Sequence, residues 1–243
     1  MRKCKFNQFG GGKIALAILL CISLFFNLYF CKKEGYWNSI LVRVHVRDAK
    51  KELPTDYWSV RGWSSCLKKM RIKCDVCFFG HSQIEMSDFQ KDFPSKKIVE
   101  LGYPGDNLDG MIRRVKQIRY VGPKKIFLLA GTNSIDYEKN DFEEKYKKLV
   151  SLIRKDNPKC ILYIMSILPQ REGSLGKATN NSIIKERNSF ISNFCKRERI
   201  TFIDIYCLCA SKNGELLQKY TKDGVHINNE CYNLIANNIR VFI

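Results

Sequence analysis

Residues 75–85 constrain the fold of this chain more than any other stretch. They read Asp-Val-Cys-Phe-Phe-Gly-His-Ser-Gln-Ile-Glu, a short apolar run that stops at a glycine and is followed by a serine. Such a run is typical of a central, buried strand of a parallel sheet. In open α/β sheets, reactive groups gather just beyond the carboxyl ends of the strands. Ser82 stands at such an end, although a serine there, taken alone, is more often a helix N-cap.

Four more apolar runs follow, and patterns of helical period separate them. The later strands are expected at 97–101, 125–130, 160–165 and 200–205. Helices are expected from Asp106 or Asn107 to about 120, and over 141–156, 182–197 and 228–241. Strands that alternate with helices in this way predict an α/β fold, in which a five-stranded parallel sheet is covered on both faces. An earlier helix from Asp56 is expected to present Trp58, Trp63, Leu67 and Met70 on one face.

Polar side chains follow three of these strands at the same edge of the predicted sheet. The strand ends read Gly80-His81-Ser82, Gly102 and Gly131-Thr132-Asn133. Oxyanions need preorganised hydrogen-bond donors. The backbone N–H groups of Ser82 and Gly102 and the side-chain amide of Asn133 are donors of that type.

A fourth element, Asp223-Gly224-Val225-His226, comes before the last helix. A serine hydroxyl is a weak nucleophile until a base takes its proton, and His226 can be that base. Asp223 can accept the other ring N–H of the histidine and fix its tautomer. Each member also has an ordinary interpretation: glycines end strands, Asn133 caps a turn, Asp223-Gly224 forms a turn, and His226 is a surface residue. Together and in this order, they favour a serine hydrolase.

The order of these elements resembles the SGNH (GDSL) hydrolase family over roughly residues 72–243. Phe79-Gly80-His81-Ser82 stands where the family has Gly-Asp-Ser, and 101–105 matches its glycine block. Gly131-Thr132-Asn133 and Asp223-Gly224-Val225-His226 match the two remaining blocks.

The resemblance implies a flavodoxin-like three-layer α/β/α sandwich and esterase or lipase chemistry that needs no cofactor or metal. It implies Ser82 as nucleophile, with Asp223 and His226 completing a triad. Ser82, Gly102 and Asn133 would form the oxyanion hole. Residues 102–110 are most similar to bacterial members that remove acetyl groups from carbohydrates.

The first block departs from the family pattern. His81 replaces the usual aspartate, and a charged histidine there would perturb His226 by like-charge repulsion at low pH or act as a second, wrongly facing base. Gln83-Ile84-Glu85 replaces the Ile-Thr with which the family often continues. Glu85 is expected to face solvent.

The N-terminus carries the signals of a membrane anchor. Residues 14–31 are almost wholly apolar and follow Arg2, Lys3, Lys5 and Lys13. Such a segment is just long enough to span a bilayer, and the basic flank places the N-terminus inside the cell. A cleaved signal peptide fits the order of the regions, but bulky residues at 28–30 disfavour cleavage and a lipoprotein site at Cys31. We expect a basic cytoplasmic segment (1–13), a signal anchor (14–31), a spacer (32–55) and an extracytoplasmic catalytic domain (56–243).

Composition limits the remaining alternatives. The net charge of +18 is spread along the chain, and no nucleic-acid recognition motif accompanies it, so no nucleic-acid partner is expected. Most of the eleven cysteines are interpreted as small buried hydrophobes, and alternation places Cys74 and Cys77 on opposite faces of the first strand, poor geometry for a metal site. One or two disulfides would be compatible with a domain outside the cytoplasm, and the sequence does not define their pairing.

Three functions remain in competition. The first is a membrane-anchored serine esterase acting on O-acyl, in particular O-acetyl, esters of an envelope carbohydrate, with small esters as substrates too. The second is a lysophospholipase or thioesterase on the same fold. The third is a non-catalytic glycan-binding module, suggested by His81.

Overall fold

The computed structural model describes residue 64, residues 67–68, and the ranges 73–133, 141–172 and 181–243, all within one compact unit that spans 60–243. The expected N-terminal segments 1–13, 14–31 and 32–55 lie outside the described residues, as do most of the expected helix from Asp56 and residues 173–180 of the loop after the fourth strand. None of the helices in the described ranges is long and apolar enough to cross a bilayer.

The sheet consists of five parallel strands in the order β2-β1-β3-β4-β5. The central strand β1 (Val76–His81) pairs with β2 (Ile98–Tyr103) on one side and with β3 (Lys125–Leu129) on the other. Strands β4 (Ile161–Met165) and β5 (Thr201–Ile203) complete the sheet. The predicted five-stranded parallel sheet is confirmed, and the strand after which Ser82 stands lies between the two other strands that carry site residues.

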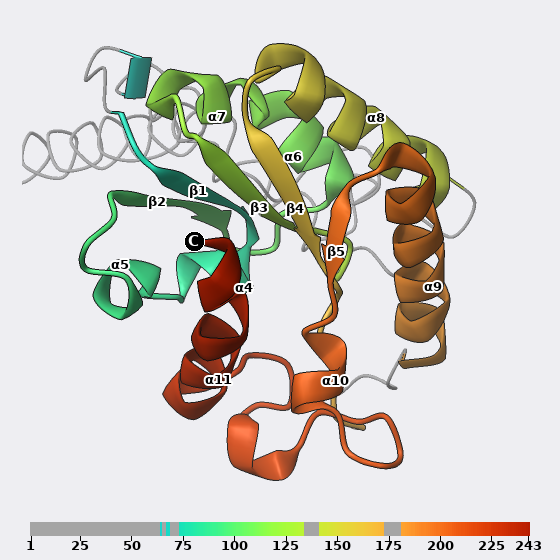
Figure 1. Cartoon of the computed structure of the whole chain (residues 1–243). Coiled ribbons are helices and arrows are strands. Elements are labelled where there is room, and N and C mark those ends of the chain that lie inside the picture. The colour runs from blue at the N-terminus through green and yellow to red at the C-terminus, as the bar shows by residue number, and fades with distance from the viewer. Residues whose placement is uncertain (1–63, 65–66, 69–72, 134–140, 173–180) are drawn as a thin grey trace, which may run out of the picture. The chain divides into compact units, whose positions relative to one another are not determined.

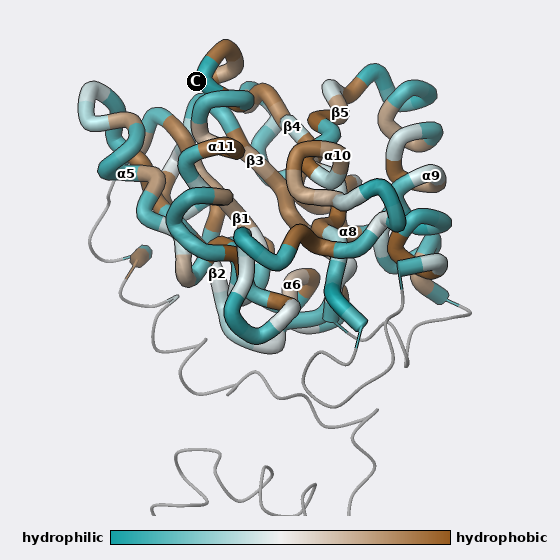
Figure 2. Tube along the Cα trace, turned by 90° about the horizontal axis from the view of Figure 1, so that it is seen from below, coloured by the Kyte–Doolittle hydropathy of each residue, from teal (hydrophilic) through white to brown (hydrophobic). Residues whose placement is uncertain are grey.

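Alternating side chains of the strands face two separate cores. Cys77 and Phe79 of β1 pack in the core beneath helices α6 to α9, whereas Val76 and Phe78 pack in the core beneath α4, α5 and α11. Strands β3 and β4 alternate in the same way. Figure 2 shows hydrophobic residues along β3 and β4 in the middle of the fold, with long hydrophilic stretches on the outer helices. The result is a three-layer α/β/α sandwich, as the resemblance implied.

The helices cover the sheet on both faces (Figure 1). One face carries the helices α6 (Leu108–Arg114), α7 (Lys116–Val121), α8 (Phe142–Asp156) and α9 (Asn181–Glu198). The other carries α4 (Ser82–Glu85), α5 (Phe89–Asp92), α10 (Tyr206–Cys209) and α11 (Asn229–Ile239), with the short 3₁₀ helices η2 (Gln218–Tyr220) and η3 (Arg240–Phe242).

Three details differ from the sequence-based expectation. Strand β5 ends at Ile203 because the Asp204 carboxylate accepts the N–H of Tyr206 at 3.0 Å and starts α10. The helix expected to 120 is interrupted at Val115 and continues as α7 to Val121. Cys74 and Cys77 lie in the same core rather than on opposite faces, because Cys74 precedes β1 and strand alternation does not apply to it.

Candidate active site

Ser82 is held at the edge of the sheet because β1 passes into α4 without a loop. The strand ends at His81 and the helix begins at Ser82. Helix α4 packs directly on the neighbouring strand: a Cβ atom on Gly102 would lie 2.1 Å from the backbone nitrogen of Glu85. A Cβ on Gly80 would lie 2.5 Å from Ile84 Cγ1. Only glycine leaves room for α4 to pack this closely, which explains the glycines at positions 80 and 102.

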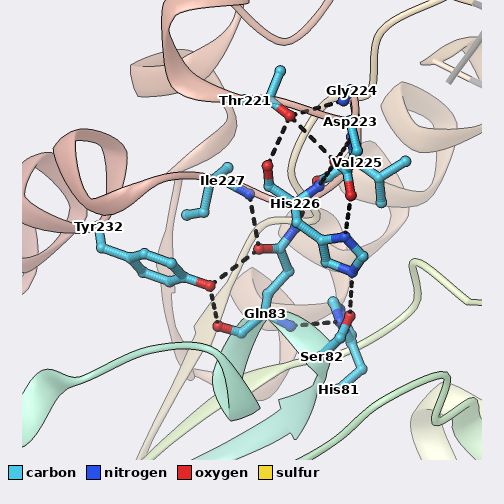
Figure 3. Close-up of polar contacts among 10 residues, drawn as sticks. All are labelled: His81, Ser82, Gln83, Thr221, Asp223, Gly224, Val225, His226, Ile227 and Tyr232. Carbon is cyan, nitrogen blue, oxygen red and sulfur yellow. Dashed lines mark hydrogen bonds and ion pairs between the residues drawn. The ribbon is translucent and has the colours of Figure 1, made fainter.

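The structure brings Ser82, His226 and Asp223 together (Figure 3). His226 Nε2 lies 3.1 Å from Ser82 Oγ, across 144 residues of sequence. His226 Nδ1 lies 2.6 Å from Asp223 Oδ2. Because an ionised carboxylate only accepts, Nδ1 is the protonated nitrogen of the neutral ring and Nε2 is left as the acceptor for the serine proton.

Asp223 is ionised at neutral pH. Burial by itself would raise the pKa of this carboxyl group. The hydrogen bonds from the His226 ring and from the backbone N–H groups of Val225 and His226 outweigh burial and lower the pKa to about 2. A carboxylate that keeps its charge is what stabilises an imidazolium next to it.

Thr221 closes the tight loop that carries the histidine, loop 221–227. Its hydroxyl donates to the backbone carbonyl of His226 at 2.7 Å and accepts the N–H of Gly224 at 2.8 Å. Gly224 has φ +82°, which glycine adopts without strain. Sequence reasoning missed Thr221, although a Thr-Lys-Asp-Gly run is a recognisable turn signal.

The two remaining predicted site residues flank Ser82. Gly102 pairs with Gly80 near the end of β2, and Asn133 follows β3 on the other side of β1. The Asn133 amide donates to the backbone carbonyl of Asp106 at 2.9 Å. An amide has two N–H donors, so this bond holds the group and leaves a second N–H. The role of Gly102 and Asn133 as oxyanion donors stays a prediction.

A buried ion pair supports this edge of the sheet. Arg114 Nε lies 2.6 Å from Asp106 Oδ2, and both side chains are fully buried. The other guanidinium nitrogens of Arg114 donate to the carbonyls of Leu101 and Gly80, at the ends of β2 and β1. The sequence signal for this ion pair is an arginine on the apolar face of the helix that starts after Asn107.

His81 has a structural position in α4, and the expected like-charge effect on His226 at low pH stays a prediction. The residue is 1% exposed, and its Nδ1 accepts the N–H of Gln83 at 3.4 Å, so it acts as the N-cap of α4. Burial, with smaller contributions from the nearby charges of His226 and Arg114, lowers the pKa of His81 to about 3. The His81 ring is therefore neutral at neutral and mildly acidic pH. Its Nε2 has no hydrogen-bond partner among the described residues.

A hollow of about 510 Å³ lies beside His226. It is lined by Met86, Lys222, Asp223, His226, Ile227, Asn228, Asn229 and Glu230. The hollow can hold part of a bound molecule next to the Ser82 hydroxyl. Within the ranges that the structure describes, no three His, Cys, Asp or Glu side chains come together as a metal site would require.

The buried neutral His81 makes a prediction about stability at acid pH. In the unfolded chain a histidine has a pKa of about 6.5, so between that pH and about 3 the unfolded chain binds one more proton than the folded chain. Above pH 6.5 the buried neutral ring therefore costs no stability. As the pH falls from 6.5 to about 3, the free energy of unfolding decreases by about 1.4 kcal/mol per pH unit. Urea unfolding at pH about 7 and about 5 should show wild type losing about 2 kcal/mol more than His81→Asn, which keeps a capping side chain. An equal loss in both proteins would contradict this account.

Comparison with known proteins places the chain in a family. Residues 80–234 match the model of the GDSL-like Lipase/Acylhydrolase family. The structure is similar to that of a GDSL-like lipase from Bacteroides thetaiotaomicron, with a TM-score of 0.65 and 21% identity over 77% of this chain and 96% of that one. It is also similar to an acetyl xylan esterase, with a TM-score of 0.57 and 16% identity over 70% and 99% of the two chains.

Curated relatives are longer proteins. The N-acylneuraminate cytidylyltransferase of Escherichia coli O18:K1:H7 is 28% identical over 173 residues, which make up 68% of this chain and 39% of the relative. The enzyme of the same name from Streptococcus agalactiae serotype V is 25% identical over 141 residues, 57% of this chain and 33% of the relative. This chain thus spans between a third and two fifths of their length. From the family match over more than half of its length, the chain belongs to the GDSL-like Lipase/Acylhydrolase family.

Proposed function

We propose that the protein hydrolyses O-acyl esters, in particular O-acetyl esters, of an envelope carbohydrate, with Ser82 as nucleophile. The observation that carries the proposal is the continuous line of hydrogen bonds from Ser82 Oγ through the His226 ring to Asp223, at 3.1 and 2.6 Å. The line stands at the carboxyl end of the central strand, where this class of fold binds its ligands.

The reaction follows from the protonation states of these groups. His226 Nε2 takes the proton of Ser82 while Oγ attacks the ester carbonyl carbon. The imidazolium that forms is stabilised by the ionised Asp223, and it then returns its proton to the departing alcohol oxygen. An acyl group stays on Ser82. Water, deprotonated by His226 in the same way, attacks this second ester and releases the acid and the free serine.

Charge develops on the carbonyl oxygen in both steps. The N–H groups of Ser82 and Gly102 and the free N–H of the Asn133 amide are the donors at this edge of the sheet. Removal of one such donor typically costs about 10²- to 10³-fold in kcat. Asp106 and Arg114 hold Asn133 in place without being donors themselves.

Two observations favour an acidic carbohydrate as the alcohol half of the ester. The curated relatives are named for an activity on an N-acylneuraminate, which is a sugar acid. The chain itself carries a net charge of +18, and Lys222 lines the hollow beside His226. A cationic protein surface raises the local concentration of an anionic polymer. The likeness to an acetyl xylan esterase indicates only that the fold accommodates this class of reaction.

Hydrolysis of p-nitrophenyl acetate, butyrate and octanoate tests the proposal. We expect the highest kcat/KM on acetate, and a loss of at least about 10³-fold in Ser82→Ala, since no other group can form the acyl intermediate. Ser189→Ala, which changes an exposed serine of α9, is the matched control and should keep wild-type activity. O-Acetylated N-acetylneuraminate and an O-acetylated neutral sugar, compared next, should differ in favour of the acidic one.

Other outcomes point to the competing functions. A preference that rises with chain length, abolished in Ser82→Ala, would move the substrate to a lysophospholipid or thioester; the side chain of Met86, 51% exposed at the hollow, is the apolar surface such a substrate would use. If the folded protein hydrolyses none of the esters but binds a glycan, the function is that of a non-catalytic glycan-binding module. Activity retained in Ser82→Ala would overturn the assignment of the nucleophile.

We further propose that residues 14–31 anchor the chain in the cell membrane with the catalytic domain outside the cytoplasm. The support is the apolar length of this segment and its basic N-terminal flank. In a bacterial host, the full chain should sediment with membranes and resist alkaline extraction, and external protease should reach the domain in spheroplasts. Two charges at the centre of the segment (Leu20→Arg with Leu24→Arg) should release it. A wild-type chain found in the soluble fraction would overturn the proposal.

A further inference from the structure

Gln83 connects the nucleophile to the base. It directly follows Ser82 in α4, and it is 3% exposed. Its Nε2 donates to the carbonyl of Val225 at 2.7 Å, and its Oε1 accepts the N–H of Ile227 at 3.4 Å (Figure 3). These are the residues immediately before and after His226. The side-chain amide of Gln83 therefore hydrogen-bonds to the backbone on both sides of His226.

Tyr232 fixes Gln83 from the opposite side. The phenol, in the first turns of α11, donates to the backbone carbonyl of Gln83 at 2.7 Å. The Tyr232 oxygen also lies 3.3 Å from Gln83 Oε1, but the phenol has one proton, and the shorter bond takes it. Gln83 is thus hydrogen-bonded to α11 through its backbone carbonyl and to loop 221–227 through its side chain.

Loop 221–227 has few direct hydrogen bonds to α4, although its Gly224 carbonyl also accepts the backbone N–H of Arg171 at 2.8 Å. Thr221 and Asp223 bond within the loop, so they fix its shape. Among the hydrogen bonds of the described residues, only those of Gln83 and the His226–Ser82 bond itself link the loop to α4.

We propose that Gln83 is a positioning residue that sets the distance between Ser82 Oγ and His226 Nε2. This inference rests on the proposed function of Ser82 and His226. A buried amide that replaces the Ile of the usual family sequence needs such partners, because an unsatisfied buried amide is costly. The same contacts make the side chain specific for glutamine: a glutamate could accept from Ile227, but when ionised it could not donate to Val225.

The test compares Gln83→Met with Gln117→Met in the full chain. Methionine has a similar volume and no strong donor or acceptor, and Gln117 of α7 is equally buried but lies in the other core layer. Both variants should lose stability. Only Gln83→Met should lose kcat on p-nitrophenyl acetate, by about 10- to 100-fold, with KM within about 2-fold, because misplacement of a reacting group affects the chemical step. Gln83→Glu should also lose kcat, and its loss relative to wild type at the same pH should become smaller as the pH falls, when its protonated carboxyl can donate to Val225.

A crystal structure of each variant separates failure of this inference from failure of the proposed function. In Gln83→Met the His226 Nε2 to Ser82 Oγ distance should exceed about 3.5 Å, beyond hydrogen-bond range. Gln117→Met should keep the wild-type distance. An unchanged distance in Gln83→Met would overturn the positioning role whether or not the wild type hydrolyses esters. A wild type without esterase activity would overturn the proposed function, and the structures would still decide the position of His226.

A second, independent observation concerns two cysteines. Cys209 Sγ at the end of α10 lies 2.8 Å from Cys231 Sγ in the first turn of α11. Both residues are fully buried in the same core. Both are free thiols in the structure, and their separation is shorter than unbonded sulfur atoms ordinarily approach and longer than a disulfide bond of about 2.05 Å. The segment between them, residues 210–230, includes Thr221, Asp223 and His226.

The geometry points to a Cys209–Cys231 disulfide that closes the segment carrying loop 221–227. The bond forms by exchange with a small disulfide such as oxidised glutathione: one protein thiolate attacks it and releases one reduced thiol, and the second protein thiolate displaces the other. Two protein thiols lose two electrons and two protons, and the small disulfide is reduced to two thiols. Exchange takes place during folding, before the core buries both sulfurs.

The full chain, refolded with reduced and oxidised glutathione, tests this second inference. Mass spectrometry after alkylation and digestion without reductant should find the 209–231 link, and reduction should lower Tm by several degrees. Cys209→Ser should lose both effects. Cys195→Ser, at a buried cysteine of the other core, should keep them. Alkylated Cys209 and Cys231 in the oxidised wild type would overturn the inference.

Discussion

The buried guanidinium of Arg114 is the interaction on which the arrangement of this edge of the sheet depends. A buried charge is costly unless it is paired and its hydrogen bonds are made. Arg114 meets that demand with the Asp106 carboxylate and the carbonyls at the ends of β1 and β2. It also lies 4.3 Å above the ring of Phe79 and 4.6 Å above that of Tyr103. These partners come from both strands and the loop that follows β2, so the ion pair keeps the strand ends in register where the sheet opens to the site.

The other half of the site is assembled from the C-terminal end of the chain. Loop 221–227 and α11 are attached to the β1–α4 junction through Gln83 and Tyr232, across more than 140 residues of sequence. Loop 221–227 is rigid through its own Thr221 and Asp223 contacts. The site therefore combines two preformed parts, and the contacts between them decide whether the base reaches the nucleophile. His81 takes part in neither set of contacts, since its position in α4 is that of the N-cap.

Much of the fold was predictable because local patterns are strong here. Apolar runs predicted all five strands, and three of these runs end at a glycine. Asn107 and Asn228 mark the starts of α6 and α11 as N-caps. The order of the elements predicted that Ser82, Asp223 and His226 come together, since parallel strands bring their carboxyl ends to one edge. The sequence did not predict the shortening of β5, the neutral state of His81 or the contacts of Gln83 with both neighbours of His226. Each depends on a partner or on burial that lies elsewhere in the sequence. The membrane segment at 14–31 stays a prediction.

By itself, the sequence determined the element types and the chemistry on offer: a serine after the first strand, a histidine and an aspartate before the last helix, and amide donors after two neighbouring strands. These follow from periodicity and residue type, which are local. Only the tertiary structure decided that His226 lies 3.1 Å from Ser82, that His81 is neutral and that Gln83 reaches both neighbours of the base. The physical reason is that distance and protonation depend on packing between segments far apart in the chain, and a linear pattern does not contain that information.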